Sequence, residues 1–203
     1  MAERAAKAPS ARRAIGIDPG TARLGYAVVE EQRGALTLIS CGVIETPAGA
    51  PMPQRLLRLY HELSRLVREL APREMAIEEL FFAKNATTVI SVGQARGIAM
   101  LVGAEADLRV CEYKPMQVKQ AVHGYGLAKK EQVGEMVRVL LGLTAIPRPD
   151  DAADAAAIAI CHLHTSHLQP SSFQLPTSSR TMLSTMSGMS LPLCCACSAA
   201  SSA

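Results

Sequence analysis

Acidic residues interrupt apolar segments of this chain at three places. Asp18 ends the run AIGI and precedes a Pro-Gly turn, and Glu78 follows the run MAI. Asp151 and Asp154 open an Ala-rich segment, where a spacing of three residues places both carboxylates on one face of a helix. A turn, an exposed strand end or a helix N-terminus could explain each of them separately. Together they could converge on one point.

Convergent carboxylates repel one another unless a cation lies between them. Ligands that are all oxygen, with no His or Cys, favour a hard ion such as Mg²⁺ or Mn²⁺. Two such ions in one site are a common arrangement for in-line attack on a phosphodiester. The acidic pattern therefore predicts phosphoryl-transfer chemistry. Asp150 precedes the helical pair, so either Asp150 or Asp151 could supply the third carboxylate.

The apolar periodicity predicts an α/β domain with a mixed five-stranded sheet and helices on its faces. Helix 53–70 is amphipathic, whereas the nearly all-apolar segment 87–106 predicts a buried helix. The expected strands are 13–18, 25–31, 35–46, 75–80 and 108–113, and the other expected helices are 117–124, 129–143 and 151–164.

The chain has 203 residues and a net charge of only +3, so nucleic-acid binding would need a local basic patch. We expect a flexible basic arm at 1–12, one domain at 13–165 and a disordered Ser-rich tail at 166–203. The cysteines near the C-terminus have no matching second cluster, so we expect no metal there. With no long apolar run and no apolar leader, a cytoplasmic protein without membrane association is expected.

Four stretches resemble the RuvC family of bacterial Holliday-junction resolvases in order and spacing. They are IGIDPGTARLGYAVV, AIEELFFAKNATTVISVGQARG, YKPMQVKQAVHGYGLAKKEQV and DAADAAAIAI, and the likeness runs from about 13 to 164. The resemblance implies a ribonuclease H-like fold, a homodimer, and symmetric paired nicks in four-way junction DNA with Mg²⁺ or Mn²⁺, two ions per active site. Recombination and repair would be the process, with RuvA and RuvB branch-migration proteins as possible partners.

The same resemblance assigns roles to individual residues. Asp18, Glu78, Asp151 and Asp154 match the catalytic, metal-binding carboxylates. Phe81 matches an aromatic residue that stacks on a base at the junction centre, and stacking tolerates any base. Lys119 and Lys130 match lysines that neutralise phosphates, and the neighbouring cations that could extend this patch are Lys84, Arg96, Lys114 and Lys129.

Three other functions fit parts of the sequence. IDPGTARLGYAV also resembles the YqgF nucleases of ribosomal RNA processing, which are shorter and lack the AKNA…GQARG block. A strand that ends in Asp-x-Gly-Thr also occurs in actin-like ATPases, but these need a second repeat and a longer chain. A junction-binding protein without cleavage would lack one of the acids, and all of them are present.

Overall fold

The computed structural model describes residues 11–79 and 86–166, which belong to one compact unit. The predicted arm and tail therefore lie almost wholly outside the described residues. The helices and strands are β1 (Arg12–Asp18), β2 (Arg23–Gln32), β3 (Ala35–Glu45), α1 (Met52–Leu70), β4 (Glu74–Glu78), α2 (Ala86–Glu105), β5 (Arg109–Tyr113), α3 (Pro115–His123), α4 (Lys130–Leu140) and α5 (Asp150–Thr165).

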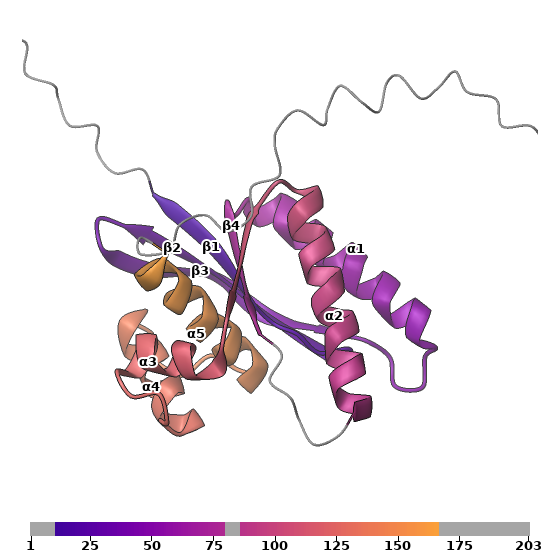
Figure 1. Ribbon diagram of the computed structural model, residues 1–203. Coiled ribbons are helices and arrows are strands. Elements are labelled where there is room, and N and C mark those ends of the chain that lie inside the picture. The colour runs from indigo at the N-terminus through magenta and orange to yellow at the C-terminus, as the bar shows by residue number, and fades with distance from the viewer. Residues whose placement is uncertain (1–10, 80–85, 167–203) are drawn as a thin grey trace, which may run out of the picture. The chain divides into compact units, whose positions relative to one another are not determined.

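The strands form one sheet in the order β3-β2-β1-β4-β5. β1, β2 and β3 pair antiparallel as a meander, whereas β4 and β5 are added parallel to β1. The prediction of a mixed five-stranded sheet is confirmed. The parallel order follows from the connections, because α1 and α2 each carry the chain back across the sheet before the next strand begins (Figure 1).

Helices cover both faces of this sheet (Figure 1). α1 and α2 pack on the face that carries large side chains, such as Ile15, Ile17 and Ile77. α3, α4 and α5 lie on the other face, where the strands present small side chains such as Ala14 and Ala76. Period-two alternation along the strands thus makes one face bulky and one face flat. The flat face lets the Ala-rich helix α5 approach closely.

Two glycines mark the closest approach of α5 to the sheet. A methyl group on Gly16 would lie 2.1 Å from the carbonyl oxygen of Ala155, and one on Gly25 would lie 2.2 Å from that of Asp151. Both distances are far shorter than real contacts, so only glycine fits at these points. Because Gly25 pairs with Asp18 across the β1–β2 ladder, this contact brings the first turn of α5 beside the end of β1.

Hydrogen bonds between buried polar side chains link the C-terminal half of α5 to β4 and β5. His162 is fully buried, and its Nδ1 shares a hydrogen bond of 2.9 Å with the Tyr113 hydroxyl. Its Nε2 is hydrogen-bonded to the carboxylate of Glu74, which also forms an ion pair with Arg12 at 3.0 Å. The hydrogen bond from His162 does most to lower the pKa of Glu74 to about 2; burial opposes it with the second-largest effect, and the bonds and charge of Arg12 lower the pKa further.

Two helix predictions were wrong in detail. The all-apolar composition of 87–106 predicts a buried helix, yet α2 exposes Ile90, Met100 and Leu101. Hydrophobicity all round a helix does not by itself show that every face has a partner. α4 ends at Leu140 rather than 143, because the chain turns at Gly142, whose φ is +62°. Across the described residues, no helix combines the length and apolarity that a membrane crossing requires.

Candidate active site

Asp18 and Glu78 lie at the same edge of the sheet. Each is the last residue of its strand, and β1 and β4 run side by side and parallel, with Ile17 paired to Ile77. The next residues along both strands are the two acids, so their carboxylates reach the same end of the molecule. Both side chains are half-buried. The sequence-based expectation that two strand-end acids are neighbours agrees with this placement.

α5 brings Asp151 and Asp154 towards this edge, near enough for their charges to act on Asp18. The pKa of Asp18 rises to about 7, first because of burial and then because of the negative charges of Glu78, Asp154 and Asp151. The pKa of Glu78 is also raised, by burial and by Asp154. Like charges in a partly dehydrated place make each further ionisation costly. This cost is released when a cation binds.

Two cationic side chains form ion pairs with Asp151 and Asp154. Lys130 Nζ lies 2.6 Å from Asp154 Oδ2, and Arg23 Nη2 lies 3.0 Å from Asp151 Oδ2. Lys119 and Lys130 are also close enough to Glu78 to act against the rise in its pKa. The site therefore consists of four carboxylates with a cationic border.

The structure separates Asp150 from Asp151. Asp151 is one of the charges that raise the pKa of Asp18, whereas Asp150 Oδ1 forms an exposed ion pair with Arg148 Nη1 at 2.7 Å. The difference arises because consecutive helical residues point about 100° apart. Of the two alternatives left open by the sequence, Asp151 is the one whose charge acts on Asp18.

The donor chemistry of this site fits a hard divalent cation. All four candidate ligands are carboxylates, and the pKa of Asp18 is raised first by burial and then by the neighbouring negative charges, which a bound cation would offset. Within 11–79 and 86–166, however, no three His, Cys, Asp or Glu side chains are close enough together to hold a metal. Asp151 and Asp154 are turned instead to Arg23 and Lys130.

The other predicted site residues fall into three groups. Lys114 and Lys129 are exposed at the N-terminal ends of α3 and α4, where their backbone N–H groups donate to Gln117 and Gln132. Arg96 is ion-paired with Glu112 and is not among the cations that affect the acids. Phe81 and Lys84 lie outside the described residues.

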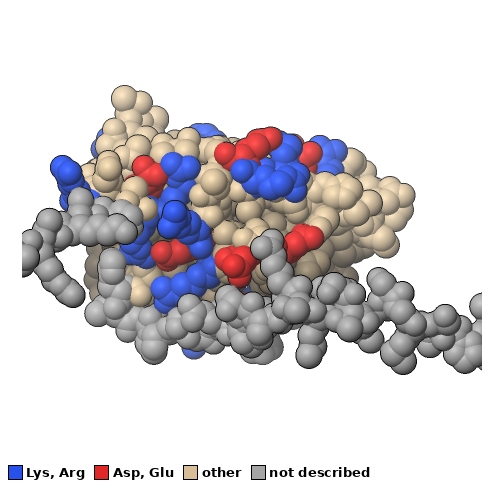
Figure 2. All heavy atoms as spheres, turned by 90° about the horizontal axis from the view of Figure 1, so that it is seen from above, with Lys and Arg blue, Asp and Glu red and all other residues tan. Residues whose placement is uncertain are grey.

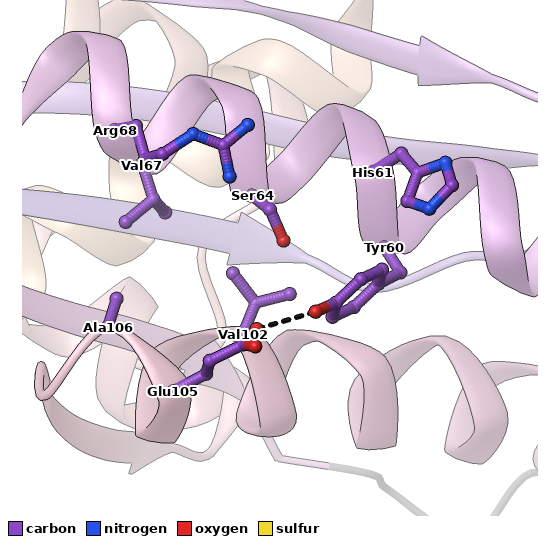
Figure 3. A pocket seen from close by; sticks show the side chains of 8 residues that line it. All are labelled: Tyr60, His61, Ser64, Val67, Arg68, Val102, Glu105 and Ala106. Carbon is purple, nitrogen blue, oxygen red and sulfur yellow. Dashed lines mark hydrogen bonds between the residues drawn. The ribbon is translucent and has the colours of Figure 1, made fainter.

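Small hollows border the acidic edge. One of about 200 Å³ is lined in part by Lys119, Lys130 and Asp154, and another of about 260 Å³ by Lys130, Asp150 and Asp154. A separate pocket of about 300 Å³ lies between α1 and α2, where Tyr60 donates a hydrogen bond of 2.7 Å to Glu105 (Figure 3). That pocket contains none of the predicted site residues.

Surface charge outside the site is mixed. On the face shown in Figure 2, Lys and Arg side chains lie among Asp and Glu side chains. Ion pairs such as Arg13–Glu30 and Arg65–Glu69 also join opposite charges. A mixed surface gives no broad attraction for a polyanion. Attraction for nucleic acid on such a face would have to come from a local group of cations.

Arg23 and Gly25 were not identified as site residues from the sequence. Arg23 forms an ion pair with the Asp151 side chain, and Gly25 packs against the Asp151 backbone. Gly25 had a usable signal, because glycine inside a strand often marks a close approach of another backbone. Arg23 had none, since an arginine at the start of a strand is ordinary.

A family model described as crossover junction endodeoxyribonuclease RuvC matches residues 14–162. The chain is 58% identical to the RuvC of Chloroflexus aggregans over 154 residues. These residues make up 76% of this chain and 94% of the relative. The protein of that name from a Roseiflexus species is 57% identical over 157 residues, 77% of this chain and 94% of the relative.

Solved structures agree with this likeness. Thermus thermophilus RuvC in complex with a Holliday junction substrate matches with a TM-score of 0.73 and 37% identity, over 76% of this chain and 94% of the other. The yeast mitochondrial Holliday junction resolvase Ydc2 shares the fold, with a TM-score of 0.57 and 14% identity over 78% and 82%. These matches confirm the expected ribonuclease H-like resolvase fold. By its matching residues and its structure, the chain belongs to the RuvC family of crossover junction endodeoxyribonucleases.

Proposed function

We propose that this protein is a crossover junction endodeoxyribonuclease that resolves Holliday junctions by paired phosphodiester hydrolysis in DNA recombination and repair. The observation that carries the proposal is that β1, β4 and α5 of a RuvC-family fold place four carboxylates at one edge of the sheet, where the charges of the other three act on Asp18. Relatives of the chain are named crossover junction endodeoxyribonuclease. The structure of the Thermus relative was solved in complex with a Holliday junction substrate. In this proposal, residues 13–165 form the catalytic domain and the protein acts in the cytoplasm.

Asp18, Glu78, Asp151 and Asp154 are the proposed catalytic and metal-binding residues. Family membership implies dependence on a divalent metal ion, and we assign Mg²⁺ or Mn²⁺ because all the ligands are oxygen. We propose two ions per site because that arrangement is common for in-line attack on a phosphodiester. Ions held by these carboxylates would activate a water and stabilise the leaving oxygen. The protein's own part is to hold the carboxylates in place, by the strand ends and by the contact of α5 with Gly25.

Lys119 and Lys130 are proposed to bind phosphates beside the scissile bond. Their charges already act on Glu78, so a phosphate held between them would lie next to the carboxylates. Lys114 and Lys129 extend this patch, and Lys84 and Arg96 stay predictions at its border. Phe81 is proposed to stack on a base near the crossover, where the strands leave the paired arms.

We further propose that two copies act together, because two sites are needed to cut two strands of like polarity in one encounter. The exposed apolar residues of α2, Ile90, Met100 and Leu101, support a contact between copies, since such groups are commonly buried in an interface. Branch-migration proteins of the RuvA and RuvB type are proposed as further partners.

Substrate preference tests the proposal. The protein should cut a synthetic four-way DNA junction in the presence of Mg²⁺ or Mn²⁺, far faster than linear duplex or single-stranded RNA, and a chelator should abolish cutting. Preference for RNA would instead indicate a YqgF-like activity. Junction binding without any cutting would indicate a protective binding protein.

A further inference from the structure

An apolar tip projects from the helical layer that carries the lysines. It consists of Met116 on α3 and of Tyr125 and Leu127 on the loop between α3 and α4, and these side chains are 60%, 57% and 67% exposed. Burying apolar surface is favourable, so such a cluster on a surface commonly marks a place of contact.

The tip has a fixed shape. Gln120 Nε2 donates a hydrogen bond of 2.8 Å to the carbonyl of Gly124, and the Ala128 N–H donates to the carbonyl of Tyr125 at 3.0 Å. A methyl group on Gly126 would lie 3.4 Å from the carbonyl of Met116, so the loop rests directly on α3. Tyr125 is thus presented to solvent on an ordered turn, which reduces the entropy lost when it contacts a partner.

Lysines flank the tip on both sides along the chain. Lys114 and Lys119 surround Met116, and Lys129 and Lys130 follow Leu127. Among the described residues, no ion pair involves Lys114, Lys119 or Lys129. A nucleic-acid strand alternates charged phosphates with uncharged sugars, so a surface that alternates lysines with apolar side chains complements it. A second copy of this chain would have to bury these positive charges against one another.

We infer that Met116, Tyr125 and Leu127 pack against the sugars and bases of a junction arm, an inference that rests on the proposed function. The neighbouring lysines would bind the phosphates of the same arm. Tyr125 is then a positioning residue for the arm that enters the acidic edge, because Lys130 joins the loop to Asp154. The contact is tolerant of sequence, since every nucleotide offers an apolar sugar and a base face.

A single tryptophan reports on this contact directly. The chain has no Trp, so Tyr125→Trp makes a protein with one, and its emission should shift or be quenched when junction DNA is added. Leu57→Trp is the control, because Leu57 is similarly exposed, at 55%, but lies on α1 across the sheet. Its emission should not change.

Affinity gives a second, independent readout. Tyr125→Ala and Leu127→Ser should each weaken junction binding by about fivefold to tenfold, and the dependence of affinity on salt should stay as in the wild type. Lys129→Ala should reduce that salt dependence, because it removes one phosphate contact. Tyr125→Phe should restore the affinity that Tyr125→Ala loses.

The inference is overturned if the wild type binds and cuts junctions while the emission of Tyr125→Trp stays constant and Tyr125→Ala binds normally. In that case the proposed function stands and only the tip loses its role. Emission that depends on protein concentration without DNA would show a contact between copies instead. If the wild type does not bind junctions at all, this inference and the proposed function fail together.

Discussion

Replacing Gly25 by alanine should disturb the acidic site through the backbone alone. The added methyl carbon would lie 2.2 Å from the Asp151 carbonyl oxygen and 3.1 Å from its Cβ, whereas ordinary contacts begin at 3.4 Å. Because β2 is held on both sides by β1 and β3, the first turn of α5 must yield, by about 1 Å. Asp151 and Asp154 would move with it.

The expected cost has two parts. Overpacking of this kind typically destabilises a protein by about 1–3 kcal/mol. A catalytic group misplaced by about 1 Å can slow a reaction by about a hundredfold. Gly25→Ala should therefore remain folded at a lower melting temperature, bind junctions nearly as the wild type does, and cut them about a hundredfold more slowly.

Gly103→Ala is a matched control, because its methyl group would press on Val110 and Met75 on the other face of the sheet. Thermal unfolding, junction affinity and the single-turnover cleavage rate are compared for both variants. Gly103→Ala should lose stability but cut at close to the wild-type rate. If folded Gly25→Ala cuts as fast as the wild type, or loses no more activity than Gly103→Ala, the contact of Gly25 with α5 does not position the acids.

Three further predictions follow from the fold and the site. Glu78→Gln should bind junctions without cutting them, and gel-shift and cleavage assays that show both properties lost together would count against the assignment of Glu78. Because the bonds from His162 and Arg12 lower the pKa of Glu74 from 4.5 to about 2, they should add about 2 kcal/mol of stability after solvent screening, present above about pH 4.5 and lost as the pH falls towards 2. Acid unfolding of Glu74→Gln should lack this contribution, and an acid unfolding curve equal to that of the wild type would contradict it. Leu101→Glu should convert a dimer into a monomer in sedimentation experiments, and an unchanged mass would exclude this face as the interface.

The sheet and the acids were predictable because local pattern determines them. Strand-end acids such as Asp18 and Glu78 stand out against apolar runs, and the helical spacing of Asp151 and Asp154 fixes their common face. These signals require no knowledge of the rest of the molecule. The resemblance to RuvC then supplied roles that spacing alone left open.

What the sequence did not predict depends on tertiary contacts. The contact of Gly25 with α5 is visible only once β2 and α5 are placed together, and the ion pair of Arg23 with Asp151 crosses the same interface. The exposed face of α2 was missed for a related reason, because composition does not show which side of a helix the sheet covers. Local pattern specifies elements, whereas such contacts belong to pairs of elements.

The most direct test of the account compares Asp18→Asn with the wild type on a labelled four-way junction. Asp18 sits where three other carboxylates act on its charge, and the substitution removes one negative charge with almost no change of shape. We expect the wild type to make paired, metal-dependent nicks, and the variant to bind the junction with similar affinity and leave it uncut. Cleavage by Asp18→Asn at the wild-type rate would contradict the placement of the active site at this edge of the sheet.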